Sequence, residues 1–307
     1  MHVPATLLII FNRPAPTRRV LDALRKVRPE RLYVAADGPR PADRHPDDPQ
    51  RVAQARAQLD AVDWPCKLQT HFHDRNMGCA RGVAEAVAWF FSHESEGLIL
   101  EDDCLPHPDF FRWGKLMLER HRDDRRVMHV NGCNLMAPES CFGGADCAYM
   151  SFPLVWGWAS WARAWKTYEL SPRLEDLPPL ASLCRPGFPF FYAAAHRARI
   201  ADAVMRLHTW DYQWSLAVLR CGGLCPTPRS NLISNIGFGA EATHTLGRDD
   251  PLAALGVCAL PDHPVIPQAS SSYLLNRYFA ERQYGKPFRI WKRHCTSRLL
   301  HVLGARR

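Results

Sequence analysis

Short apolar runs alternate with segments of helical periodicity through the first 135 residues, and this alternation limits the fold more than any other feature of the chain. The strands predicted from the apolar runs lie at 5–11, 31–37, 66–73, 97–100 and 127–132. Between them apolar residues recur every three or four positions, most clearly at 80–91. Strands and helices that alternate in this way form a parallel sheet covered on both faces. The sequence therefore predicts an α/β fold with a mostly parallel central sheet and helices on both faces.

Polar side chains follow three of these strands. Arg13 comes after the first strand and Asp37 after the second, and the triplet Glu101-Asp102-Asp103 follows the fourth. Ligands of parallel sheets bind at the carboxyl ends of the strands. Adjacent carboxylates on a turn are hard oxygen ligands that suit Mg²⁺ or Mn²⁺. The alternatives are a solvated acidic turn for the triplet, a turn cap for the aspartate in "DGPRP", and a surface cation for the arginine.

A fourth candidate is Asp211 in "HTWDYQW", a carboxylate flanked by tryptophans. Partial desolvation there is expected to raise its pKa and its basicity, which is how general bases are made. The alternative is an exposed residue near a helix N-terminus, stabilised by the helix dipole. The glycine-rich segment "NIGFGAEATHT" at 235–245 has no Lys-Ser/Thr after its glycines, so we expect a mobile lid rather than a phosphate-binding loop.

The net charge of +8 is concentrated toward the basic, aromatic-rich end of the chain after residue 275. Such a segment suits an anionic membrane surface, and a solubilising helix is the alternative. No apolar run approaches the ~20 residues that a membrane span needs, and the run at 5–11 is too short for a secretion signal. We therefore expect a cytoplasmic protein with peripheral contact to the inner face of the plasma membrane, and no nucleic-acid partner.

Seven segments, taken in order, resemble the GT-A glycosyltransferases, and within that fold the N-acetylglucosaminyltransferase I type and its bacterial relatives. They are "IIFNRPAPTRRVLDAL", "VAADGP", "NMGCARGVAEAV", "LILEDDCLPHPDFF", "WGWASWARAW", "TWDYQW" and "RSNLISNIGFGAEATHT". The resemblance implies a GT-A (Rossmann-like) domain over 1–245, with a nucleotide-sugar half at about 1–135 and an acceptor half at about 136–245. Residues 246–307 lie outside it as a basic, partly helical C-terminal extension.

The resemblance also implies roles for the polar residues at the strand ends. The acidic triplet matches the DxD-like motif of the family, with Asp103 as the direct ligand of Mn²⁺ or Mg²⁺. Asp102 is then expected near the ribose and Glu101 near the donor sugar. Arg13 matches the position that meets the nucleotide diphosphate, and Asp37 the one that contacts the uracil edge.

The remaining roles that the resemblance implies fall in the second half of the chain. Asp211 matches the base that deprotonates the acceptor hydroxyl. The loop 236–245, with Gly237 and His244, is expected to order over the bound donor. The tryptophan-rich stretch, with Trp158, is expected to help wall the donor and acceptor pocket. The helix at "GCARGV" carries no residues that match the family.

Taken together, these features predict an inverting, divalent-metal-dependent hexosyl- or N-acetylhexosaminyltransferase. The donor is a nucleotide-diphosphate sugar, expected to be a UDP-sugar, and the acceptor is a glycan or lipid-linked hydroxyl. The expected task is the synthesis of a bacterial cell-surface polysaccharide. One alternative is a sugar nucleotidyltransferase, which usually carries a glycine-rich basic loop where this chain has "NRPAPTRR". Another is a non-catalytic nucleotide-sugar binder, against which an acidic triplet together with a candidate base argues.

Overall fold

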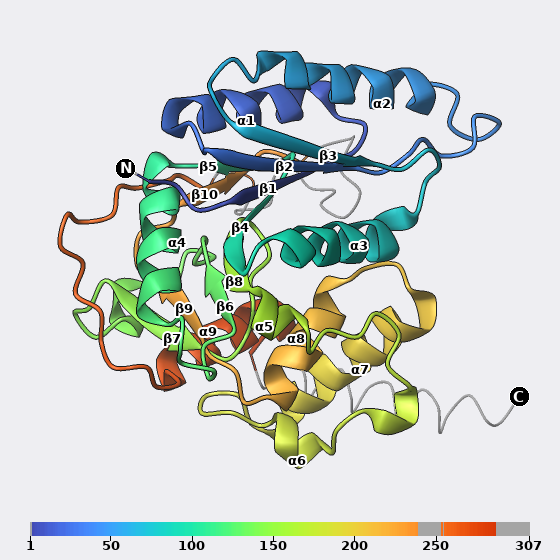
Figure 1. Ribbon diagram of the computed structural model, residues 1–307. Helices are drawn as coiled ribbons and strands as arrows, with labels where there is room; N and C mark the ends of the chain where they lie inside the picture. The colour runs from blue at the N-terminus through green and yellow to red at the C-terminus, as the bar shows by residue number, and fades with distance from the viewer. Residues whose placement is uncertain (1, 239–252, 254, 287–307) are drawn as a thin grey trace, which may run out of the picture.

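The computed structural model describes residues 2–238, 253 and 255–286, and a six-stranded sheet lies at its centre (Figure 1). The strands are β1 (Thr6–Ile10), β2 (Arg31–Ala36), β3 (Lys67–Phe72), β4 (Glu96–Glu101), β6 (His129–Asn131) and β8 (Trp158–Trp161). Their order across the sheet is β3-β2-β1-β4-β8-β6. The pairs β3-β2, β2-β1 and β1-β4 are parallel, whereas β8 runs antiparallel to both β4 and β6. The predicted α/β class with a mostly parallel sheet is confirmed.

Helices cover both faces of this sheet (Figure 1). They are α1 (Pro14–Val27), α2 (Asp48–Ala57), α3 (Gly78–His93) and α4 (Pro108–Arg120). Figure 1 shows α1 and α2 on one face and α3 on the other. Because both faces are covered, the central strands are apolar throughout: Leu7 and Leu8 of β1 are adjacent in sequence, point to opposite faces, and are both fully buried.

The order of the strands changes direction beside β1. The chain runs from β1 to β2 to β3 on one side, and β4 then pairs with β1 on the other side. In open α/β sheets this switch point leaves a crevice at the carboxyl ends of the two strands. The segments that follow β1 and β4, which carry Arg13 and the acidic triplet, therefore meet at this crevice.

The second half of the chain packs beneath the sheet in the view of Figure 1. Its elements are β7 (Cys147–Met150), α5 (Ala162–Trp165), α6 (Leu180–Leu183), α7 (Phe190–Arg206), α8 (Asp211–Arg220), β9 (Cys225–Pro228) and β10 (Ile233–Asn235). Two small antiparallel ladders accompany the main sheet: β7 pairs with β9, and β10 pairs with β5 (Cys104–Pro106), which directly follows the triplet. The helices predicted through 191–207 and 209–220 correspond to α7 and α8.

Two further elements complete the core. The stretch "WGWASWARAW" contains β8, which lies between β4 and β6, so the strand predicted at 127–132, observed as β6, joins the sheet through β8. Within the predicted extension 246–307, helix α9 (Tyr273–Tyr284) packs on β7 and α7. Leu275 and Ala280 of α9 are buried in the main core.

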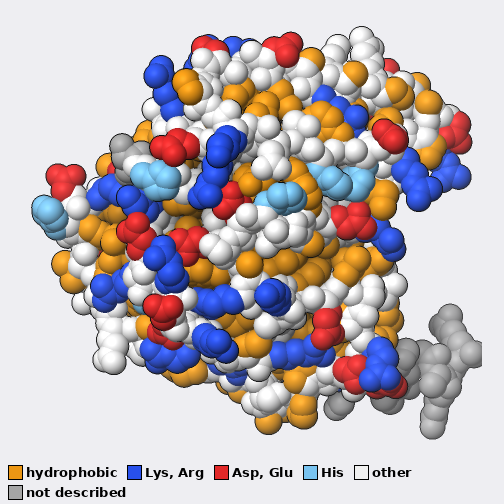
Figure 2. All heavy atoms as spheres, in the orientation of Figure 1, with side chains coloured by type: hydrophobic (Ala, Val, Ile, Leu, Met, Phe, Trp, Pro, Cys, Tyr) orange, Lys and Arg blue, Asp and Glu red, His pale blue; other side chains and the backbone are white. Residues whose placement is uncertain are grey.

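Within the described residues, no helix is long and apolar enough to cross a membrane. Figure 2 shows Lys and Arg side chains scattered over the face seen in Figure 1, among Asp and Glu side chains, rather than gathered into one basic patch. Several arginines of the described residues form surface ion pairs, as Arg122 does with Glu96 and Arg126 with Asp124.

Candidate active site

A cavity of about 540 Å³ lies at the carboxyl edge of the parallel strands. One side, which we call the strand-end wall, carries Arg13, Asp37 and the triplet Glu101-Asp102-Asp103. The other side, which we call the helix wall, carries Arg199 of α7 and residues 208–212, which link α7 to α8 and begin α8. The structure therefore brings the candidate residues of both halves of the chain to one cavity.

The positive group that meets the acidic triplet within this chain is Arg13. Its Nη1 donates to Oδ2 of Asp103 at 2.9 Å, and its Nε and Nη2 donate to the two carboxylate oxygens of Asp102. The three side chains are 14%, 13% and 3% exposed, respectively. Phe11, the first residue after β1, donates its backbone N–H to Oδ2 of Asp102 at 3.3 Å. The loop after β1 and the turn after β4 are thus joined across the switch point.

Within the described residues the cluster stays negative overall, because three carboxylates lie near one guanidinium. Burial, together with the charges of Asp103 and Asp102, raises the pKa of Glu101 to about 8. Burial also raises the pKa of Asp102 to about 6, while the contact with Arg13 opposes that rise. Even with Glu101 protonated, two carboxylates face one cation. Binding of an anionic ligand at this cluster would therefore require a further positive charge in addition to Arg13.

Gly237 lies directly against Asp103. The ladder between β10 and β5 continues beyond Asn235, because Ile236 donates its backbone N–H to the carbonyl of Asp103 at 2.8 Å. The Gly237 N–H donates to Oδ1 of Asn235 at 2.8 Å. A Cβ at position 237 would overlap the Asp103 carboxylate, so only glycine fits without displacement. His244, the other residue predicted in this loop, lies outside the described residues.

Asp37 lines the cavity and also fastens the loop before α3. Its Oδ1 accepts the backbone N–H groups of Gly38 and Met77 at 2.8 and 2.7 Å. Its Oδ2 accepts from Gly78 N at 3.0 Å and from Asn76 Nδ2 at 2.9 Å. These four bonds use about all the acceptor capacity of a carboxylate. The predicted contact with a nucleotide base would therefore have to share oxygens that already hold the loop.

A second, half-buried ion pair near the strand-end wall was not predicted from the sequence. Arg40 donates through Nε and Nη2 to Asp48 at 2.6 and 2.8 Å, and Asn12 donates to the same carboxylate at 2.7 Å. The hydrogen bond with Arg40 lowers the pKa of Asp48 to about 2. The guanidinium also lies 5.5 Å from the centre of the Phe11 ring. The signal in the sequence is Asp48 itself, an acidic residue followed by proline that begins a helix.

On the helix wall, Asp211 is the first residue of α8 and is half-buried. The hydroxyl of Thr209 donates to its Oδ1 and so fixes the carboxylate. Cys79, in the first turn of α3, also lines the cavity, and burial together with the charges of Glu101 and Asp211 raises the pKa of its thiol to about 12. Asp211 and the strand-end wall thus line one cavity.

Trp158 does not line the cavity. The Trp158 side chain is fully buried and has no accessible surface. Its ring stacks on that of His129, with the centroids 4.9 Å apart, and on that of Trp210, at 5.7 Å. β8 is covered on both faces, which is why a tryptophan there packs in the core. Trp156 and Trp210 line the cavity instead, and Trp158 supports Trp210 from behind. This position corrects the expectation that Trp158 walls the pocket.

The residues present fit a divalent cation that is only partly coordinated by protein. Among the described residues, Oδ1 of Asp103 accepts one hydrogen bond, from the thiol of Cys104 at 3.5 Å, so it can serve as a hard oxygen ligand. Within the described ranges, no group of three or more His, Cys, Asp or Glu side chains converges as a metal cage. Mg²⁺ commonly binds through one or two carboxylates and completes its shell with substrate phosphates and water. The donor set at Asp103 is of that kind.

No known protein-family model and no curated protein sequence matches the chain. Among solved structures, HddC from Yersinia pseudotuberculosis aligns with 13% identity and a TM-score of 0.27 over 41% of this chain, and the match spans just over half, 57%, of HddC. A protein from Bacillus anthracis described as a glucose-1-phosphate thymidylyltransferase, solved with sucrose, aligns with 7% identity and a TM-score of 0.31. That match covers 58% of this chain and 77% of the other. At such TM-scores neither likeness carries an argument about activity.

Proposed function

We propose that this protein is an inverting glycosyltransferase that moves a sugar from a nucleotide-diphosphate donor, a UDP-sugar in the simplest case, to a hydroxyl of a glycan or lipid-linked acceptor. The observation that carries the proposal is the placement of Asp211 opposite the Arg13-Asp102-Asp103 cluster in one cavity. The cavity lies at the carboxyl edge of the sheet beside its switch point, where such folds bind ligands.

On the strand-end wall, Arg13 is the group suited to the donor diphosphate, because a guanidinium hydrogen-bonds two phosphate oxygens at once. The net negative charge of the cluster supports the proposal of a divalent cation, Mn²⁺ or Mg²⁺, held by Asp103. Such an ion, when bound, stabilises the negative charge that develops on the leaving diphosphate. Gly237 leaves Asp103 room in this wall, since any side chain there would displace the carboxylate.

On the helix wall, Asp211 would accept the proton of the acceptor hydroxyl while that oxygen attacks the anomeric carbon. The bond to the diphosphate breaks on the opposite face of the sugar, so one displacement inverts the configuration. The transition state has oxocarbenium character, as in other glycosyl chemistry. The hydrogen bond from Thr209 holds the Asp211 carboxylate through Oδ1 and leaves Oδ2 for the acceptor.

A sugar nucleotidyltransferase would also place a diphosphate and a cation at the strand-end wall. It would have no use for a carboxylate on the far side of the cavity, because its reaction occurs at the α-phosphate. The products separate the two activities: glycosyl transfer releases a nucleoside diphosphate, whereas nucleotidyl transfer consumes a nucleoside triphosphate and releases pyrophosphate.

The proposal extends to the membrane surface through the charge of the chain end. Residues 286–307 contain seven Lys or Arg and no Asp or Glu, and they follow α9, which ends at Tyr284. Basic clusters bind anionic lipid, and lipid-linked acceptors lie at that surface. Vesicles containing phosphatidylserine should retain the wild-type chain, and replacement of these seven residues by glutamine should release it. Equal retention of both chains would contradict the membrane contact.

The central test is a thermal-shift titration with UDP and several UDP-sugars, with and without Mn²⁺, on wild type and Asp103→Ala. Ligands that bind only the folded state raise the melting temperature by mass action. We expect a Mn²⁺-dependent shift in wild type that Asp103→Ala abolishes, followed by release of UDP in a transfer assay. No shift with any nucleotide in the presence of Mn²⁺ would contradict the proposal, and release of pyrophosphate from UTP would favour the nucleotidyltransferase.

A further inference from the structure

One cationic side chain of the cavity differs from the others in its partners. Three arginines line the cavity, Arg13, Arg40 and Arg199. The first two form ion pairs with Asp102 and Asp48, respectively. Across the described ranges, Arg199 forms no ion pair with a carboxylate: its Nη1 donates to the Tyr212 hydroxyl at 3.2 Å, and its Cζ lies 5.5 Å from the centre of the Tyr284 ring. No carboxylate of the described residues therefore neutralises its charge.

The two aromatic contacts hold Arg199 in place without neutralising it. A guanidinium stacked on a ring keeps its fork of N–H donors available to a planar or tetrahedral oxyanion. Tyr284 is itself fixed, because its hydroxyl is hydrogen-bonded to the Nδ1 of buried His196. Arg199 is an exposed residue, and these two contacts hold its guanidinium at the cavity.

Tyr212 adds a second donor beside it. Its hydroxyl oxygen accepts from Arg199 and, at 3.2 Å, from Nε2 of Gln283. A phenol has one proton to donate and two lone pairs. Both lone pairs are occupied, so the proton is directed to a different group, and none of the described residues accepts it. Tyr212 lines the cavity, where a ligand can accept this proton.

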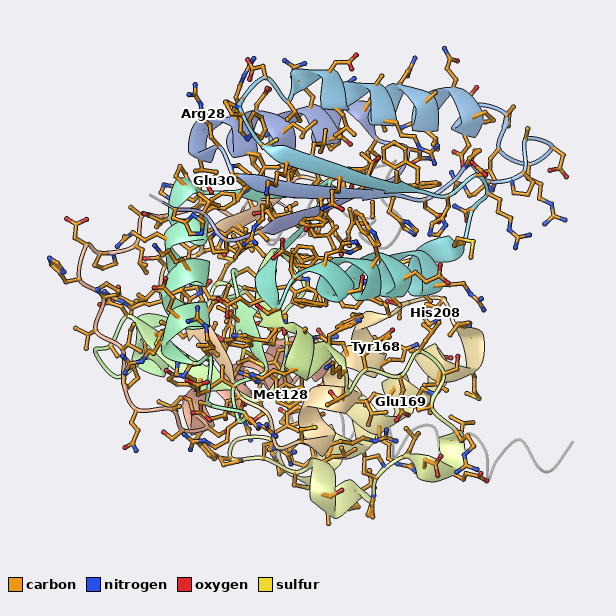
Figure 3. All side chains as sticks on the ribbon, in the orientation of Figure 1. Arg28, Glu30, Met128, Tyr168, Glu169 and His208 are labelled. Atoms are coloured by element: carbon orange, nitrogen blue, oxygen red, sulfur yellow. The ribbon has the colours of Figure 1, made fainter. Side chains whose placement is uncertain are left out.

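These donors line the same cavity as the candidate base. Tyr212 follows Asp211 directly, and His208, which also lines the cavity, lies on the segment between α7 and α8 (Figure 3). Within the described residues Arg199 does not pair with Asp211, so the base keeps its carboxylate for a hydroxyl proton. A molecule that offers a hydroxyl to Asp211 therefore shares this cavity with the Arg199 guanidinium and the Tyr212 hydroxyl.

We propose that the acceptor carries an oxyanion, a phosphate or a carboxylate, close to the attacking hydroxyl, and that Arg199 and Tyr212 bind it with His208 at the rim. The acceptor class is thus an acidic sugar or a phosphate-linked sugar rather than a neutral glycan. This inference rests on the proposed function, because it takes the helix wall to be the acceptor side. A neutral acceptor would leave the donors of Arg199 and Tyr212 without partners, whereas an oxyanion forms charge-assisted hydrogen bonds with them.

The test compares matched probes that differ in charge. Phenyl β-D-glucuronide, phenyl phosphate and neutral phenyl β-D-glucoside are titrated calorimetrically into wild type, Arg199→Gln and Arg206→Gln, with UDP and Mn²⁺ saturating to occupy the strand-end wall. Arg206 is the control because it lies on the same helix, is 72% exposed and pairs with Asp202 away from the cavity. Circular dichroism melts establish that each variant is folded.

We expect wild type and Arg206→Gln to bind at least one anionic probe about tenfold more tightly than the glucoside, and Arg199→Gln to lose that preference. UDP binding should be the same in all three proteins. If wild type does not distinguish the anionic probes from the glucoside, or if Arg199→Gln keeps the preference, the oxyanion site is wrong while UDP binding still supports the transferase. If UDP does not bind but the anion preference depends on Arg199, the oxyanion site stands and the proposed function fails.

Discussion

The two walls of the cavity differ in whether their charged and polar side chains are paired with other described residues. On the strand-end wall, Arg13 is paired with Asp102 and Asp103, and the oxygens of Asp37 are all engaged by the loop before α3. On the helix wall, Arg199 forms no ion pair within the described residues, and Tyr212 has a proton to donate. The first wall is a rigid arrangement whose groups hold one another. The second presents donors that the described residues leave available, which is why we propose a ligand there.

The largest expected effect falls on the helix wall. Asp211→Asn keeps the shape of the side chain and removes the base, so the rate of transfer should fall by roughly 10²–10⁴-fold. UDP binding, a property of the strand-end wall, should not change. Asp202→Asn on α7, 46% exposed and paired with Arg206, is the matched control and should transfer at the wild-type rate. Loss of UDP binding in Asp211→Asn would contradict the assignment of UDP to the strand-end wall alone.

The next largest effect is on the stability of the strand-end wall. Arg13→Gln removes the guanidinium that contacts Asp102 and Asp103, and leaving buried charge unpaired typically lowers the free energy of unfolding by about 3–5 kcal/mol. Because Asp102, whose pKa is already raised, can take up a proton, we expect a loss near the lower end, about 3 kcal/mol, in guanidinium chloride denaturation. Arg25→Gln removes the partner of Asp63 in an exposed pair and should change stability far less. Equal losses in the two variants would mean that the cluster is not held by its charges.

Gly237→Ala probes the fit between β10 and the Asp103 carboxylate. The added methyl group overlaps that carboxylate, and overpacking of this kind typically destabilises by about 1–3 kcal/mol. The Mn²⁺-dependent shift with UDP should weaken in parallel, since Asp103 must move. Gly256→Ala is the control, because a Cβ there meets nothing and the residue lies away from Asp103. Unchanged stability and unchanged UDP binding in Gly237→Ala would refute the close contact.

The smallest effect concerns acid stability. The pKa of Asp48 is lowered from 3.8 to about 2 in the folded protein, so its stabilising contribution is complete above about pH 4 and is lost as the pH falls through about 2. Because Arg40 is 38% exposed, solvent screening limits this contribution to about 1–2 kcal/mol. The free energy of unfolding, measured by urea denaturation, should therefore fall more steeply between pH 4 and pH 2 for wild type than for Asp48→Asn. Parallel pH profiles would show that the pair contributes no stability.

The sequence predicted the parts of the fold that depend on local pattern. Apolar runs and helical spacing placed β1 to β4 and α1, α3 and α4, and strands that end side by side carried Arg13, Asp37 and the triplet to one edge. The contacts within the site depend on chain segments far apart. Arg13 meets Asp102 across 89 positions, and Asp37 is engaged by residues about 40 positions later.

The second half of the chain was harder to predict for the same physical reason. Trp158 is in the core because β8 is inserted between β4 and β6, and no local pattern in a tryptophan-rich stretch shows which of its rings will be covered. Arg199 was not among the predicted site residues, because its place beside Tyr212 depends on how α7 packs against α8. Asp211 was a candidate because it lies between two tryptophans, the resemblance implied the same role, and its role as the base stays a prediction.

The position of α9 has a consequence for the order in which the cavity is built during protein synthesis. Gln283 and Tyr284, at the end of α9, contact Tyr212 and His196, so the helix wall is complete only after the ribosome has made residue 284. The residues of the strand-end wall precede Cys104 and emerge much earlier. Because regions near the N-terminus generally fold first on the ribosome, the nascent chain can form its Arg13 cluster while the Arg199 side of the cavity still lacks its support.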